Sequence, residues 1–142
     1  SLELDPAEME KRNIHLQQKY AEIEEKEVRY EEIHCDDAEY LIVAFGSCAR
    51  IAQKAMEEAR AEGIKVGLLR PITLWPFPSK AIAERSRQVK GILTVELNAG
   101  QMVEDVRLAV ECKVPVEYFG RLGGIVPDPD EVVTALKEKI IK

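Results

Sequence analysis

Three apolar segments of the sequence each lead directly into residues that could bind or transform a ligand. In chain order, they are 41–45 followed by Gly46 and Ser47, 66–69 followed by Arg70, and 92–95 followed by Glu96. A carboxylate at the end of a buried strand can serve as a general acid or base, and a Gly-Ser turn that opens a helix can bind an anion through its backbone amides. Ligands of open parallel sheets bind beyond the carboxyl ends of the strands. We therefore expect these residues to share one edge of a sheet.

Glu96 has a catalytic and a structural interpretation. No His, Ser or Cys is placed to form a catalytic dyad with it, so the sequence predicts no catalytic residue. A buried carboxylate needs a partner, and Arg70 is predicted to lie on the same edge. We predict a structural or interface ion pair between Arg70 and Glu96. Ser47 also receives a structural interpretation, as the N-cap of a helix, while anion binding at Gly46-Ser47 stays open.

An apolar, proline-rich loop follows Arg70. Trp75 and Phe77 lie among Pro71, Pro76 and Pro78, which restrict the backbone. Large aromatic side chains are enriched at the centres of protein interfaces, but they also cover the core of their own domain. Both interpretations stay open from the sequence. The further residues that we expect at this edge are Asn98 and Gln101, which follow Glu96 at the turn into the next helix.

Composition excludes several classes of partner. The net charge of −6 disfavours nucleic acid and anionic membranes, and no apolar run reaches the roughly 20 residues that span a bilayer. Cys35, Cys48 and Cys112 form no CxxC pair, and His15 and His34 have no metal-ligating neighbours, so no metal or iron–sulfur site is predicted. The low cysteine density is typical of a cytoplasmic protein.

Hydrophobic periodicity predicts a three-layer α/β/α fold. A long helix over residues 6–34 is followed by alternating strands and helices, with a mostly parallel sheet of four to five strands. The strand predicted over residues 114–119 contains Pro115, which indicates either an edge position in the sheet or the start of the strand. We predict two units: 1–38, a linker helix from a preceding domain, and 39–142, the α/β domain.

These segments together resemble a known family. The succession Phe45-Gly46-Ser47, then the stretch 69–78 (LRPITLWPFP), then the stretch 95–101 (VELNAGQ), resembles the C-terminal region of the α subunit of 2-oxoacid:ferredoxin oxidoreductases, in particular the 2-ketoisovalerate and 2-oxoglutarate members. The pair Gly123-Gly124, followed by Pro127, also fits. The likeness covers about residues 39–140.

The resemblance implies a transketolase-C-terminal-like fold and a parent enzyme that decarboxylates a 2-oxoacid oxidatively to acyl-CoA. It implies thiamine diphosphate, magnesium, iron–sulfur clusters and coenzyme A in the parent, none of them bound by this chain. The implied partners are other domains of the same subunit, the other subunits and ferredoxin. The eight positions expected to line the packing edge are Gly46, Ser47, Arg70, Trp75, Phe77, Glu96, Asn98 and Gln101.

Two other functions remain open from the sequence. One is a stand-alone module that binds a small anion, and the other is the corresponding domain of another transketolase-like enzyme, such as a 2-oxoacid dehydrogenase E1 component. The apolar seam of the first helix, formed by Met9, Leu16, Tyr20 and Ile23, also predicts self-association of the chain. The sequence does not identify the 2-oxoacid.

Overall fold

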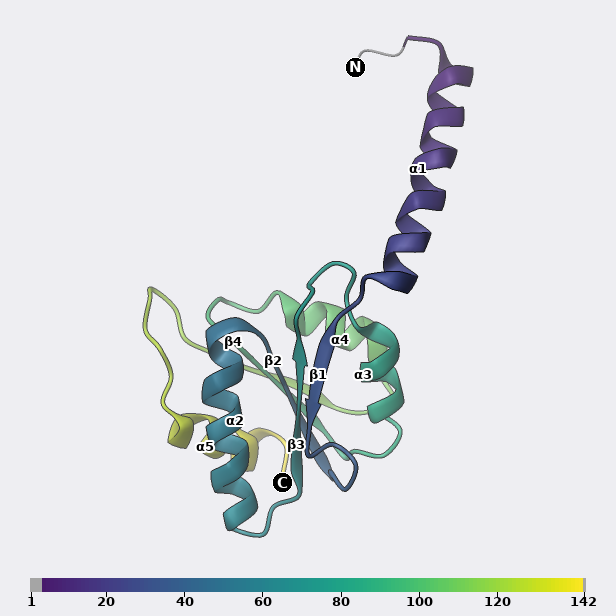
Figure 1. Ribbon diagram of the computed structural model, residues 1–142. Helices are drawn as coiled ribbons and strands as arrows, with labels where there is room; N and C mark the ends of the chain where they lie inside the picture. Colours follow the sequence, from purple (N-terminus) through teal and green to yellow (C-terminus); the bar gives the residue numbers. More distant parts are fainter. Residues whose placement is uncertain (1–3, 142) are drawn as a thin grey trace.

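The computed structural model describes residues 4–141 as a mostly parallel sheet covered by helices on both faces (Figure 1). The elements in chain order are α1 (Pro6–Lys26), β1 (Tyr30–Ile33), β2 (Tyr40–Ala44), α2 (Gly46–Ala61), β3 (Val66–Pro71), α3 (Ser79–Arg85), β4 (Ile92–Glu96), α4 (Met102–Val110), β5 (Val116–Gly120) and α5 (Pro129–Lys139). The strand order is β1-β3-β2-β4-β5, and only β1 runs antiparallel to its neighbour. The predicted three-layer α/β/α fold is confirmed, as is the edge position of β5.

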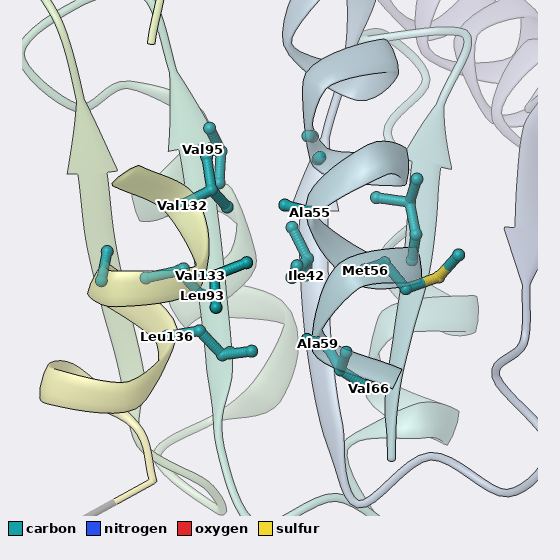
Figure 2. Close-up of a cluster of buried hydrophobic side chains, with 14 of the residues drawn as sticks. Ile42, Ala55, Met56, Ala59, Val66, Leu93, Val95, Val132, Val133 and Leu136 are labelled. Carbon is teal, nitrogen blue, oxygen red and sulfur yellow. The ribbon is translucent and has the colours of Figure 1, made fainter. Parts of the chain in front are cut away.

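The two faces of the sheet carry separate hydrophobic clusters. Ile42 and Leu93 point towards α2 and α5 and belong to one buried cluster with Ala55 of α2 and Leu136 of α5 (Figure 2). Leu41 and the other odd-numbered residues of β2 point to the opposite face, which α3 and α4 cover. Because every side chain of β2 beyond Tyr40 is buried, its sequence shows no alternation of apolar and polar residues. This alternation of faces decides which residues can meet at the end of the sheet.

The predicted helix over residues 6–34 is wrong over residues 27–34. α1 ends at Lys26, and Tyr30–Ile33 forms the edge strand β1, which pairs antiparallel with β3. The helical pattern failed here because β3 offers a free edge whose hydrogen bonds only a strand can complete, and this tertiary pairing overrides local propensity. Part of the predicted unit 1–38 therefore belongs to the sheet. Its role as a linker stays a prediction, and positions 1–3 and 142 lie outside the described residues.

α1 stands away from the body of the domain (Figure 1). Its start agrees with the sequence, because the Asp5 carboxylate accepts a hydrogen bond from the Ala7 amide at 2.9 Å. None of its described residues is buried. It leaves the body beside the loop between β3 and α3, since Tyr30 at the start of β1 pairs with Pro71 at the end of β3.

A tight crossing holds the segment between β1 and β2 against β3. A side chain at Gly67 would meet the His34 carbonyl oxygen at 2.8 Å, so only glycine fits without movement. The buried Cys35 thiol donates to the Leu68 carbonyl at 3.3 Å. Arg85 of α3 adds ion pairs to Glu32 at 2.6 Å and to Asp36 at 3.0 Å. These contacts fix the amino edge of the sheet.

The Cys35 contacts predict a stability loss at alkaline pH. Burial, followed by the charge of Glu32, raises the pKa of the thiol from 9.0 to about 11. Above about pH 9 the unfolded chain loses this proton while the folded chain keeps it, so the free energy of unfolding falls until about pH 11, in total by about 2–3 kcal/mol. Urea unfolding of wild type and Cys35→Ala at pH 8 and pH 10.5 measures this slope. We expect the variant to lose less stability over this interval, and equal losses would contradict the prediction.

Candidate functional site

The polar residues that follow the three apolar segments lie together at the carboxyl edge of the sheet, as predicted. β2 pairs in parallel with both β3 and β4, and Ala44 lies opposite Val95. Gly46-Ser47, Arg70 and Glu96 therefore emerge at one end of three adjacent strands. We call the four segments that follow β2, β3, β4 and β5 at this end the carboxyl rim; they comprise residues 45–47, which include the start of α2, and the loops 72–78, 97–101 and 121–127.

Glu96 stabilises the start of α4 and faces no open space. Its side chain is 1% exposed. One carboxylate oxygen accepts hydrogen bonds from the amides of Gln101 at 3.2 Å and Met102 at 2.7 Å, and the other accepts from Val103 at 3.0 Å. A carboxylate at the positive end of a helix is electrostatically favourable. Because its buried carboxylate is engaged by three backbone amides, Glu96 has a structural task.

The predicted ion pair between Arg70 and Glu96 is wrong. Arg70 pairs instead with Glu31 of β1, with 3.2 Å between guanidinium nitrogen and carboxylate oxygen. Two facts separate Arg70 from Glu96. β2 lies between their strands, and Arg70 shares the sheet face of Leu68 whereas Glu96 shares that of Ile92. The backbone amides of α4 supply the compensation that Arg70 was expected to give.

The Gly46-Ser47 turn is built differently from the prediction. Gly46 has a φ of +56°, a conformation that a side chain disfavours, and it begins α2 directly after Phe45. Phe45 occupies the N-cap position, and no side chain caps the helix there. The N-cap role of Ser47 is therefore wrong, and Ser47 is an exposed residue of the first turn. Anion binding at this turn stays a prediction.

Asn98 and Gln101 shape the turn between β4 and α4. The Asn98 side-chain oxygen accepts from the Gly100 amide at 2.8 Å, and its carbonyl accepts a hydrogen bond from the Tyr118 hydroxyl. Burial, together with the nearby charge of Glu96, raises the pKa of Tyr118. Gln101 contributes its amide to Glu96, while its side chain is exposed. These residues hold the rim in shape.

The two aromatic residues of the proline-rich loop lie in different environments. Phe77 packs on the hydrophobic cluster under α3 and α4, whereas Trp75 is 55% exposed. The Trp75 ring meets the Tyr20 ring of α1 edge-on, with 5.8 Å between their centroids. The loop and the second half of α1 enclose a groove of about 650 Å³. The interface interpretation therefore suits Trp75, and the core interpretation suits Phe77.

Exposed apolar side chains concentrate on the carboxyl rim. Among the described residues, the large exposed hydrophobic side chains at the rim are Ile72, Leu74, Trp75, Leu97, Leu122, Ile125 and Val126. Arg121 carries the only charge in the rim sequence, and it is bound to Glu131 at 2.6 Å. Sequence reasoning named Trp75 alone of these seven. The near absence of charge from these segments, in which Arg121 is the one charged residue, is the signal that could have identified the others.

The loops at the opposite edge of the sheet are rich in charged residues. Their charged residues are Asp36, Asp37, Glu39, Glu62, Lys65, Arg87, Lys90, Glu111 and Lys113. Several are paired, and the bond from Arg60 lowers the pKa of Asp37. A contiguous apolar surface is typical of an interface, whereas a charged edge is typical of contact with solvent. The asymmetry identifies the carboxyl rim as the candidate docking surface.

The described residues offer little for catalysis or metal binding. No group of three His, Cys, Asp or Glu residues among positions 4–141 converges as a metal site would. His34 lies at the amino edge, and His15 lies within α1, so neither histidine belongs to the rim. Burial raises the pKa of Cys48, as expected of an inert thiol rather than a nucleophile. No described helix is long and apolar enough to cross a membrane.

Comparison with known proteins assigns the fold to a family. Residues 38–132 match the model of the pyruvate:ferredoxin oxidoreductase core domain II. The chain belongs to this family. The match to core domain II covers every element from β2 to the start of α5, which includes the four parallel strands, and the edge strand β1 lies before it. The resemblance to 2-oxoacid:ferredoxin oxidoreductases is confirmed at this level.

Individual relatives agree with the assignment to core domain II. The chain is 50% identical over 138 residues to ketoisovalerate oxidoreductase subunit VorB of Methanothermobacter thermautotrophicus, covering 97% of this chain and 39% of that subunit. It is 33% identical over 101 residues to 2-oxoglutarate synthase subunit KorA of Methanothermobacter marburgensis, covering 71% and 27% respectively. The chain thus spans about two fifths of the VorB subunit.

Solved structures show the same fold. A 2-oxoglutarate:ferredoxin oxidoreductase from Magnetococcus marinus, with 2-oxoglutarate, coenzyme A and succinyl-CoA bound, superposes with a TM-score of 0.83 and 25% identity over 97% of this chain and 24% of that one. A split-gene transketolase, an inactive β4 tetramer, matches with a TM-score of 0.67 and 22% identity over 78% and 40% of the two chains. The latter shows the fold alone and confirms the transketolase-like architecture.

Proposed function

We propose that this chain is the non-catalytic docking domain of the α-type subunit of a 2-oxoacid:ferredoxin oxidoreductase. The observation that carries the proposal is the carboxyl rim, where three separate loops present exposed apolar side chains, while the adjacent buried carboxylate of Glu96 is fully engaged in the domain's own structure. Such a rim suits packing against another protein surface better than binding of a charged substrate. The remainder of the α-type subunit is the occupant that we propose for the rim. α1 supports this choice, because it leaves the domain on the same side.

The family narrows the chemistry of the complete enzyme. Because this chain's relatives include ketoisovalerate and 2-oxoglutarate enzymes, we propose oxidative decarboxylation of a 2-oxoacid to acyl-CoA as the parent reaction. Thiamine diphosphate, magnesium, iron–sulfur clusters and coenzyme A would be bound by the rest of the enzyme, with ferredoxin as electron acceptor. The family match favours neither a stand-alone anion-binding module nor a 2-oxoacid dehydrogenase E1 domain. The free thiols Cys35, Cys48 and Cys112 suit a cytoplasmic enzyme.

Complementation of a truncated enzyme tests this role. The chain alone should not reduce ferredoxin when it is given a 2-oxoacid, thiamine diphosphate, magnesium and coenzyme A. The complete enzyme lacking this domain should lose assembly and activity, and adding the chain in trans should restore both. Turnover by the isolated chain would contradict a non-catalytic role, and full activity of the truncated enzyme would contradict a docking role.

A further inference from the structure

α1 carries a strict seven-residue hydrophobic repeat. Met9, Leu16 and Ile23 are its half-buried residues, and every other residue of the helix is exposed. A spacing of seven places the three side chains in one column along the helix, and a sustained repeat of this kind predicts pairing of helices in a left-handed supercoil. The column extends over the three heptads of α1. We call these three residues the α1 seam; Tyr20, which the sequence grouped with them, is more exposed and lies beside this column.

Helices rely on tertiary packing for most of their stability, and α1 has almost none within the described structure. It is a 21-residue helix without a buried residue, and it projects from the domain (Figure 1). We propose that α1 pairs in parallel with α1 of a second copy of this chain, with the α1 seam at the interface. This proposal is independent of the docking role of the carboxyl rim.

The charges beside the seam favour a second copy and fix its direction. Arg12, Lys19 and Lys26 form a basic row on one side of the seam, and Glu10, Gln17 and Glu24 form an acidic and polar row on the other. In a parallel pair the basic row of one helix faces the acidic row of its partner, which brings Lys19 towards the partner's Glu24. In an antiparallel pair, basic faces basic and acidic faces acidic. The charge pattern is therefore self-complementary only for parallel pairing.

Asn13 and Tyr20 form a second column beside the α1 seam, and this column would also face the partner helix. Asn13 lies at the position where a single asparagine specifies register and number of strands in coiled coils, because in a parallel pair it meets its own copy and can hydrogen-bond to it. Tyr20, one heptad later, rests edge-on against Trp75 of its own chain. The proline-rich loop thus supports α1 at the end of the seam nearest the domain.

Sedimentation equilibrium of the full 142-residue chain tests the pairing. Wild type should show a monomer–dimer equilibrium, and Leu16→Glu, in the centre of the seam, should remain monomeric at every concentration. Ile14→Glu is the matched control, because Ile14 is 53% exposed on the same helix but lies outside the seam; it should dimerise like wild type. A monomeric wild type, or a dimer unaffected by Leu16→Glu, would overturn the proposal.

Charge reversal tests the direction of the pair independently of whether Leu16→Glu disturbs the helix. Lys19→Glu should weaken the dimer by about tenfold, since two attractive pairs become repulsive. Adding Glu24→Lys to the same chain should restore the affinity, because each pair is re-formed with its charges exchanged. If Lys19→Glu alone strengthens the dimer, the helices run antiparallel and the parallel arrangement is overturned.

Discussion

Replacing Glu96 with alanine should lower the free energy of unfolding by about 3 kcal/mol, the largest stability effect that we expect from a single substitution at this edge of the sheet. The change leaves the amides of Gln101, Met102 and Val103 without their acceptor at the buried start of α4. Glu96→Gln keeps the shape and one acceptor oxygen but turns an amide group towards a backbone donor, so its cost should be about 1–2 kcal/mol. Urea unfolding monitored by circular dichroism measures both.

Glu104→Gln is the matched control for Glu96. Glu104 is also in the first turn of α4 but is exposed, so its substitution should change stability by less than about 0.5 kcal/mol. If Glu96→Gln were as harmless as Glu104→Gln, the capping role of Glu96 would be wrong. If instead a stable Glu96→Gln enzyme assembled normally but lost turnover, a catalytic carboxylate would have to be reconsidered.

Replacing Trp75 with alanine should weaken binding of this chain to the rest of the enzyme by about thirtyfold or more. Exposed aromatic residues at the centre of an apolar interface commonly contribute about 2 kcal/mol or more to affinity. Calorimetric titration of the chain into the enzyme lacking this domain measures the effect. Because Trp75 also touches Tyr20 of α1, Val126→Glu at the far loop of the carboxyl rim separates the two surfaces, and it should weaken binding similarly.

Leu108→Ala is the control for this surface. Leu108 is 78% exposed but lies on α4, away from the rim, so its loss should leave the affinity unchanged. Equal binding by wild type, Trp75→Ala and Val126→Glu would show that the carboxyl rim is not the docking surface. Equal losses for Leu108→Ala and Trp75→Ala would show that the effect is not specific to the rim.

Much of the fold was readable from local sequence. The unalternating apolar runs at 41–45 and 92–95 predicted buried parallel strands, because strands covered on both faces need apolar residues at every position. Since parallel strands end at the same edge, the common location of Ser47, Arg70 and Glu96 followed from the sequence as well. Strand pairing and helix capping could not be predicted as securely, because each depends on which backbone groups the tertiary structure leaves free.

The sequence by itself determined the layers, the direction of the parallel strands and the edge at which the polar signatures meet. Only the tertiary structure decided the partners of those residues. Arg70 faces Glu31 because residues 30–33 leave the helical pattern to complete the free edge of β3, and Glu96 faces the amides of α4 because alternation along β4 turns its side chain to that face. Consecutive residues of a strand point to opposite faces of the sheet, and this much follows from the sequence. The strand order and the helix that covers each face are set by tertiary packing.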